Sequence, residues 1–255
     1  MARSRSIQHA TLDDGTPIQL VDAADGPIQI EHYIDEDPQH PDAWMRFLSR
    51  MATFRKDYSE WQTAVMDSVT FMELAARKHS QYILKPKTKE PRQWFADSTD
   101  SLEEMLMLSF GSFRLNVVVC AHVDEDKDEV NGMFVRNPSA PGRMRKRSPA
   151  GFSELYHSYV GADERGERQY LLQTRSDRLY NCSSQIEAAD PSWPRYADLW
   201  TGWPTTQDRP WLHVLNYGDS GSGKSTFAAT FPKPMIVFMW DPLGKEMPYL
   251  KAARS

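Results

Sequence analysis

One stretch near the end of the chain constrains the fold more than any other. Residues 218–226 read Gly-Asp-Ser-Gly-Ser-Gly-Lys-Ser-Thr, which fits the pattern G-x-x-x-x-G-K-[ST]. An apolar run at 211–215 leads into this stretch, and Phe227–Phe231 follows it. These flanking runs predict the strand, loop and helix that the motif requires. We therefore expect an α/β fold with a mostly parallel sheet and a phosphate-binding loop after one of its strands.

The residue types of the loop suit phosphate binding. Gly218, Gly221 and Gly223 permit a tight turn whose backbone N–H groups converge on phosphate oxygens, with a helix N-terminus behind them. Lys224 is expected to reach the β and γ phosphates, and the Ser225 hydroxyl to hold Mg²⁺. The full set of expected cofactor-binding residues is Gly218, Asp219, Ser220, Gly221, Ser222, Gly223, Lys224, Ser225 and Thr226.

An acidic partner for this metal is expected well upstream of the loop. Little more than one helix and one strand can follow Lys224, so the other strands of the sheet must come from earlier in the chain. The stretch from Trp61 to Met66 predicts a short buried strand that ends in Asp67 and is followed by hydroxyl residues. We expect this strand to lie beside the phosphate-loop strand, with Asp67 directed toward the Mg²⁺ that Ser225 holds. A helix-capping role for Asp67 is the alternative.

Two further strands are expected to end in residues that face the same ligand. Residues 114–123 contain five successive apolar or small positions after Asn116, which is typical of a buried parallel strand. His122 at its end is either a sensor of the γ-phosphate or a loop histidine without a task. Residues 234–240 predict a second buried strand, after which Asp241 or Glu246 is expected to orient the attacking water. A simple turn aspartate is the alternative for Asp241.

The rest of the chain predicts helices, hairpins and a linker. We expect an amphipathic helix from Asp42, as its cap, to about Tyr58. Further helices are expected at 72–83, 101–110 and 152–160. Hairpins are expected at 11–34 and, around Arg175–Asp177, at 169–182, where Arg175 or Arg178 is either a phosphate contact or surface charge. As a single domain, 1–255 divides into a peripheral hairpin and loop (1–41), the main part of the core (42–188), a linker (189–210) and the phosphate-loop unit (211–255).

Charge limits the partners that the chain can have. The net charge of −5 and pI near 5.8 exclude a globally basic nucleic-acid binder, so nucleic-acid contact needs a local patch. Residues 136–147 hold five positive charges and no acid: Arg136, Arg143, Arg145, Lys146 and Arg147. This run is either a solvated mobile loop or a segment that contacts the phosphate backbone of single-stranded DNA.

The remaining composition indicates a cytoplasmic protein with one sizeable core. At 255 residues and 40% hydrophobic content, the chain is long enough for such a core. Cys120 and Cys182 lie far apart and lack metal-ligand spacing, so we expect two reduced, semi-buried thiols. No apolar run of 18 residues occurs, and we therefore expect no membrane partner and a cytoplasmic location.

Four stretches together resemble the RecA-like ATP-binding proteins of phages and prophages, which include the Sak-type single-strand-annealing proteins. The stretches are G-D-S-G-S-G-K-S-T-F-A-A-T-F-P-K-P, I-V-F-M-W-D-P-L-G-K-E-M-P-Y-L, T-A-V-M-D-S-V-T-F and N-V-V-V-C-A-H-V. The resemblance implies a RecA-like P-loop core and ATP hydrolysis with Mg²⁺, coupled to single-stranded DNA in phage recombination or replication. Lys224, Ser225, Thr226 and Asp67 carry over as phosphate and metal residues, and His122 as the switch before a DNA-binding loop. It also implies a homo-oligomer, as a ring or filament.

The order of these stretches departs from the family, whose members begin with the P-loop. Rotating the sequence to start near Trp203 restores the family order, which indicates either circular permutation or an arbitrary cut in a circular genome. The position two residues after Asp241, where RecA has a glutamate, holds Leu243. Hydrolysis is therefore expected to be slow, or to use Glu246 or a neighbouring subunit. The alternatives are a small-molecule kinase or other P-loop NTPase without DNA binding, and a nucleotide-dependent assembly factor without turnover.

Overall fold

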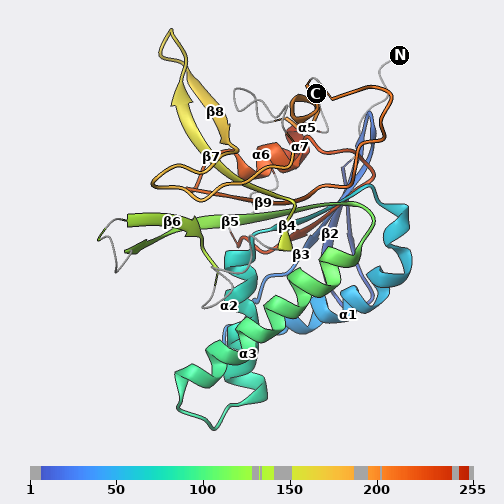
Figure 1. The fold of residues 1–255 in the computed structure, drawn as a ribbon. Coiled ribbons are helices and arrows are strands. Elements are labelled where there is room, and N and C mark those ends of the chain that lie inside the picture. The colour runs from blue at the N-terminus through green and yellow to red at the C-terminus, as the bar shows by residue number, and fades with distance from the viewer. Residues whose placement is uncertain are drawn as a thin grey trace.

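The chain folds around a large mixed sheet. The computed structural model describes residues 7–127, 132, 134–140, 151–186, 195–201, 203–242 and 247–252. Its strands form a 10-stranded, mostly parallel sheet with helices on both faces, as Figure 1 shows. The predicted α/β class is therefore confirmed. None of the helices in these described parts of the chain is long and apolar enough to cross a membrane.

The parallel part of the sheet joins strands from both ends of the sequence. In sheet order its strands are β3 (Gly26–His32), β10 (Met235–Met239), β4 (Thr63–Asp67), β5 (Asn116–Lys127), β9 (His213–Gly218) and β7 (Glu154–Ala162). The late strand β10 thus lies between two early strands, and it pairs with both in parallel. Strand β5 separates β4 from β9, so the expectation that the acid-bearing strand lies directly beside the phosphate-loop strand is wrong.

Antiparallel strands extend this parallel block. β1 (Ile7–Thr11) and β2 (Pro17–Ala23) continue the sheet from β3, β8 (Arg168–Gln173) pairs with β7, and β6 (Phe134–Pro138) pairs with the far half of β5. The predicted N-terminal hairpin is present. It is not peripheral, however, because β3 is part of the parallel block and Ile28 and Ile30 on it are fully buried.

Helices cover the two faces of the sheet in separate groups (Figure 1). One face carries α1 (Ala43–Asp57), α2 (Val69–His79) and α3 (Pro91–Glu103); the other carries α5 (Tyr196–Leu199), α6 (Lys224–Ala228) and α7 (Met247–Ala252). A 3₁₀-helical turn follows α1 at Tyr58–Glu60, and a π-helical turn follows α2 at Ser80–Leu84. After α3 come a π-helical turn at Glu104–Ser109 and a 3₁₀-helical turn at Phe110–Ser112. The helices expected at 42–58 and 72–83 are confirmed, whereas the one expected at 101–110 begins earlier, at Pro91. The Asp42 side chain does not cap the first helix, because the Ala43 N–H donates to Asp35 Oδ1 instead.

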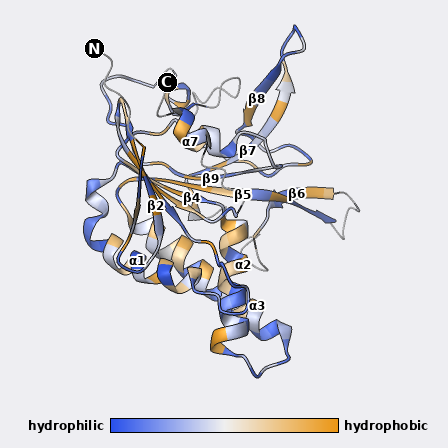
Figure 2. Ribbon diagram, turned by 180° about the vertical axis from the view of Figure 1, so that it is seen from behind, coloured by the Kyte–Doolittle hydropathy of each residue, from blue (hydrophilic) through white to orange (hydrophobic). Residues whose placement is uncertain are grey.

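Strand β10 shows how both faces of the sheet are filled. Ile236 and Phe238 belong to the hydrophobic cluster on the α1 side, while Met235, Val237 and Met239 belong to the cluster on the α6 side. Successive side chains of a strand point to opposite faces, so an unbroken apolar run is what a strand buried on both sides requires. Figure 2 shows the corresponding hydrophobic colouring along the central strands and on the helix faces turned toward them.

Three local predictions in the second half of the chain are wrong or incomplete. Residues 152–160 do not form a helix, because β7 runs through them with Leu155 in one core cluster and Tyr156 in the other. Residues 169–182 do not form a hairpin of their own, because β8 pairs with β7 instead. The expected linker at 189–210 contains the short helix α5, whose Leu199 is buried.

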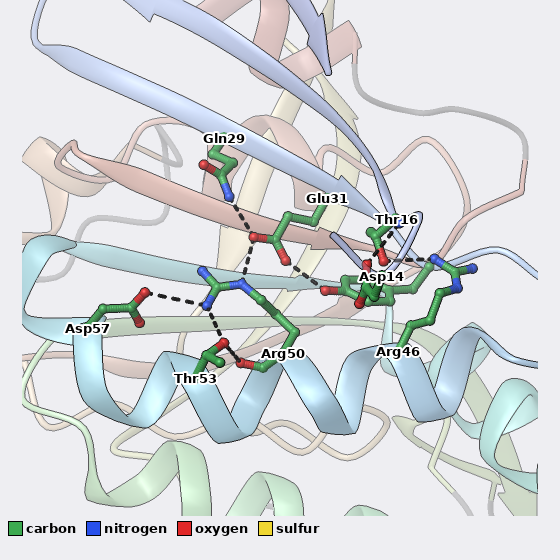
Figure 3. Close-up of polar contacts among 9 residues, drawn as sticks. Asp14, Thr16, Gln29, Glu31, Arg46, Arg50, Thr53 and Asp57 are labelled. Carbon is green, nitrogen blue, oxygen red and sulfur yellow. Dashed lines mark hydrogen bonds and ion pairs between the residues drawn. The ribbon is translucent and has the colours of Figure 1, made fainter. Parts of the chain in front are cut away.

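A buried ion pair fixes α1 across β3, as Figure 3 shows. Glu31 is fully buried, and its Oε1 accepts hydrogen bonds from Arg50 Nε at 2.9 Å and Gln29 Nε2 at 2.6 Å. Tyr33 donates its hydroxyl to the other carboxylate oxygen at 2.7 Å. A buried carboxylate needs such partners, since removing one of them leaves an uncompensated charge in a medium of low polarity.

We predict that Arg50→Ala lowers the free energy of unfolding by about 3–5 kcal/mol, because Glu31 then stays buried without its cation. Denaturant unfolding checks this, with Lys56→Ala as the matched control. Lys56 is an exposed cation on the same helix, and its removal is expected to change stability by less than about 0.5 kcal/mol. Equal small effects in the two variants would contradict the role of the Glu31–Arg50 pair.

Candidate functional site

The glycine-rich loop joins the end of β9 to the start of α6. Gly221 and Gly223 have φ of +77° and +95°, in the left-handed region that favours glycine. Gly223 is also crowded, because a Cβ built on it would lie 2.8 Å from the Tyr170 ring. The sequence G-x-x-G-x-G therefore reflects both the backbone conformation of the loop and the close approach of a neighbouring strand.

Lys224 is folded back over this loop. Its Nζ donates hydrogen bonds to the backbone oxygens of Gly218 at 2.9 Å and Asp219 at 2.8 Å, and the side chain is buried. The ammonium group is thus fixed at the wall of a cavity that the loop encloses. Asp219 contributes its backbone to this arrangement.

The hydroxyl of Ser225 and the carboxylate of Asp67 meet at the same cavity. Ser225 Oγ donates to Asp67 Oδ2 at 2.5 Å, although the two residues are 158 positions apart. Tyr249 from α7 donates its hydroxyl to the same oxygen at 2.8 Å. The alternative that Asp67 caps a helix is therefore wrong, because its carboxylate accepts hydrogen bonds from these two hydroxyls. The structure therefore brings the two predicted metal ligands together.

Opposing effects set the protonation of Asp67. Burial raises the pKa of this carboxyl above its usual value, and the nearby Asp241 adds to the increase. Hydrogen bonds from Ser225 and Tyr249 and the positive charge of Lys224 act in the opposite direction but do not cancel it. Burial likewise raises the pKa of Tyr249 far above its usual value, so its hydroxyl remains a neutral donor. A cation bound beside Asp67 would relieve the cost of its buried charge.

The cavity has a volume of about 290 Å³ and is partly open to solvent. Its lining combines loop residues with residues from β4, β5, β8 and α7 and with the segment after β10: Asp67, Ser68, His122, Tyr170, Ser220, Gly221, Gly223, Lys224, Ser225, Thr226, Asp241 and Pro248. Ser222 is buried beneath the loop. The glycine-rich loop, Asp67, His122 and Asp241 thus line one cavity.

His122 lies where β5 leaves the parallel sheet. The sequence predicted that the strand ends at His122, but β5 continues to Lys127. His122 is opposite Gly218 in the last parallel register with β9, and beyond it β5 pairs with β6 instead. Its backbone N–H donates to Thr70 Oγ1 at 3.1 Å, and its ring meets Phe71 edge-on at 5.7 Å.

Asp241 follows β10 at the same edge of the sheet. It is buried and lines the cavity, and the backbone N–H of the preceding Trp240 donates to the backbone oxygen of Asp67 at 2.7 Å. Asp241 is therefore held close to Asp67. Glu246, the other candidate for orienting water, lies outside the described residues, as does Leu243.

Only one of the five positively charged residues of the predicted cationic segment falls within the described part of the chain. Arg136 lies on β6, where its Nε pairs with Glu125 at 3.1 Å and its Nη1 donates to the Tyr180 hydroxyl at 2.6 Å. This arginine is therefore engaged by one partner on β5 and by Tyr180, which lies outside the β5–β6 ribbon. Arg143, Arg145, Lys146 and Arg147 lie outside the described residues.

Three cavity or loop contacts were not anticipated from the sequence. Arg168 Nη2 donates to the backbone oxygen of Gly221 at 2.9 Å, Tyr170 packs on Gly223, and Tyr249 bonds to Asp67. No motif marks these residues. The alternation of Arg168 and Tyr170 on one face of a strand was the one available signal, and it was hidden because β8 was assigned to the wrong hairpin.

The donor set fits a hard divalent cation. Mg²⁺ takes oxygen ligands, and in nucleotide sites it uses one or two protein groups together with water and phosphate. A serine hydroxyl and a buried carboxylate in direct contact satisfy this requirement. Among the described residues, no group of three or more His, Cys, Asp or Glu side chains that could hold a metal ion is found.

Comparison with known proteins identifies no relative: no protein-family model, no curated protein and no solved structure matches this chain.

We predict that Asp67→Asn stabilises the folded chain near neutral pH while it weakens metal binding. The raised pKa of Asp67 means that the folded state holds the proton more tightly than the unfolded chain does. The stability that the protonated Asp67 side chain contributes is therefore fully present below about pH 3.9, the pKa of aspartate in the unfolded chain. This stability is lost as the pH rises through the raised pKa that Asp67 has in the folded chain. Asparagine cannot ionise, so the variant escapes this loss and should unfold at a higher temperature than the wild type.

Thermal unfolding from about pH 4 to neutral pH checks this prediction. The advantage of Asp67→Asn should grow as the pH rises, whereas the exposed control Asp13→Asn should show no such trend. A variant that is less stable than the wild type at neutral pH would show that the charge of Asp67 is already compensated without a metal.

Proposed function

We propose that this chain binds and hydrolyses Mg-ATP in the cavity described above, and that its core is RecA-like. The observation that carries the proposal is the 2.5 Å contact between Ser225 and Asp67 beside Lys224. A phosphate-loop motif alone predicts only where phosphate would bind. The contact between the Ser225 hydroxyl and the buried Asp67 carboxylate supports a metal-binding position in the same site.

The chain's own residues have separate tasks in this reaction. The loop N–H groups and Lys224 bind the β and γ phosphates and stabilise the charge that develops on the transferred phosphoryl group. Ser225 and Asp67 would hold Mg²⁺, which supplies further charge neutralisation when bound. Asp241 lies close to Asp67 and lines the cavity, so it is the described residue best placed to orient the attacking water. His122 would respond to the γ-phosphate from the neighbouring strand.

The strand order supports the RecA-like assignment in a permuted sequence. The unit β9–α6–β10 comes last in the chain, yet β10 lies between β3 and β4 and β9 lies between β5 and β7. Both strands are fully integrated, so the unit is part of the core and not an appendage.

We further propose that ATP turnover is coupled to single-stranded DNA. The coupling element is β5, which runs from the cavity at His122 into the ribbon with β6. Figure 1 shows this ribbon projecting beyond the edge of the sheet. The cationic sequence at 141–147 follows directly after it. A movement of His122 would therefore be passed through β5 and β6 toward the residues to which the resemblance assigns DNA binding.

We predict that Lys224→Ala abolishes ATP turnover, with a loss of at least about 100-fold, because it removes a charge that stabilises the transition state. Asp241→Asn should lower the turnover number by a similar factor while ATP affinity stays within about threefold, since its task is confined to the reaction. Steady-state ATPase assays and calorimetric titration with Mg-ATP measure both quantities. Turnover that survives Lys224→Ala would contradict the proposal, and binding without turnover in the wild type would favour a nucleotide-dependent assembly factor.

We predict that single-stranded DNA stimulates this turnover and that Arg143, Arg145 and Arg147 are required. Changing the three to alanine should remove salt-sensitive DNA binding, because each phosphate contact contributes about −0.7 to the slope of log K against log salt concentration. Replacement of the exposed Lys87, Lys89 and Arg92 by alanine is the matched control, because it also removes three positive charges and none of them lines the cavity. ATPase activity that is indifferent to DNA but rises with a small acceptor would instead identify a kinase.

A further inference from the structure

The β7–β8 hairpin places an aromatic side chain in the phosphate cavity. Tyr170 on β8 lines the cavity together with the loop, and 39% of its surface is exposed. Its ring lies against Gly223, so that a Cβ built there would meet ring atoms at 2.8 and 3.0 Å. The other residues that line the cavity are glycines, polar or charged residues and Pro248, so phosphate binding alone does not explain an exposed tyrosine ring there.

Arg168 holds this ring in place. Its guanidinium lies 5.2 Å from the centre of the Tyr170 ring and donates to the backbone oxygen of Gly221 at 2.9 Å. The hairpin is therefore tied to the loop at two points, through Gly221 and through Gly223. A ring that is covered by a cation and rests on backbone loses little freedom when a second flat group stacks beside it.

Sheet order gives the cavity two different ends. Asp67, His122 and Asp241 come from β4, β5 and β10, which lie on one side of the loop strand β9. Tyr170 comes from β8, which lies on the other side, beyond β7. Metal and reacting phosphate belong with the acids on the first side, so the nucleoside end of a bound nucleotide must extend away from them, toward Tyr170.

From these contacts we infer that Tyr170 is the surface on which the nucleobase of the bound nucleotide stacks, with Arg168 as the residue that positions it. This inference rests on the proposed function, since it assigns the nucleoside half of the same site. Every base has a flat π-face, so this contact adds affinity for a nucleotide over inorganic polyphosphate without selecting one base. The hydroxyl of Tyr170 is not needed for such stacking.

Calorimetric titration with Mg-ATP and with magnesium tripolyphosphate tests the inference. Tyr170→Ala should raise the Kd for Mg-ATP by roughly 5- to 150-fold, the range that base–aromatic stacking supplies, and leave the Kd for tripolyphosphate unchanged. Tyr170→Phe should bind both ligands like the wild type. Tyr159→Ala is the matched control, because Tyr159 is equally exposed, at 37%, on the same hairpin but does not line the cavity.

The outcomes separate this inference from the function on which it rests. Wild-type protein that binds tripolyphosphate as tightly as Mg-ATP would overturn the stacking role and leave the phosphate site intact. Equal losses for both ligands in Tyr170→Ala would show that the ring only shapes the loop, which also overturns it. A wild type that binds neither ligand would overturn both proposals. Unfolding temperatures of the variants close to that of the wild type establish that the losses concern binding.

Discussion

The hydrogen bond between Ser225 and Asp67 is the contact on which the site depends. It joins the first turn of α6 to the end of β4 across 158 residues of sequence, at 2.5 Å. The carboxylate is buried, and burial raises its pKa, so the folded chain holds a group whose charged form is costly without a partner. Lys224 and the hydroxyls of Ser225 and Tyr249 offset part of this cost. Such a site suits a cation, because a bound cation would stabilise the charged carboxylate and offset the cost of its burial.

The sheet makes this contact possible by joining both ends of the chain. β10 pairs with β3 on one side and β4 on the other, which aligns the ends of β4 and β10 and brings Asp67 close to Asp241. β5 separates the acid strand from the loop strand, and it carries His122 to the same cavity. The buried Glu31–Arg50 pair then fastens α1 to β3, at the strand where the N-terminal hairpin enters the parallel block. Packing on both faces, and not the loop motif, therefore fixes the position of the carboxylate.

Sequence patterns predicted the parts of this architecture that have a strong local signal. The unbroken apolar runs of β4, β5 and β10 were recognised because strands buried on both faces have no polar alternation. The acid after β4 was identified because the loop motif requires a metal ligand elsewhere. Strand order was not accessible in this way: nothing local in Thr63–Asp67 says that β5 separates it from β9.

Failures of sequence reasoning fell where the signal was weak or came from tertiary contacts. In β7, Leu155 and Tyr156 are adjacent and point to opposite faces, which over a short segment is hard to tell from a helix. That error assigned β8 to another hairpin, so Arg168 and Tyr170 were not placed near the loop. Tyr249 has no motif at all, and its role follows only from the packing of α7 against the loop helix. The DNA-binding role of 136–147 stays a prediction, since Arg136 is the one cation of this segment that is described, and it is paired with Glu125.

A double-mutant cycle on metal-dependent nucleotide affinity tests the shared metal site most directly. The quantity is the gain in ATP affinity that Mg²⁺ produces, measured for wild type, Asp67→Asn, Ser225→Ala and the double variant. If the two residues hold one ion, each single change removes most of the gain, and the double variant loses little more than either one. Losses that add in full, or a gain that survives Asp67→Asn, would contradict a common Mg²⁺ site.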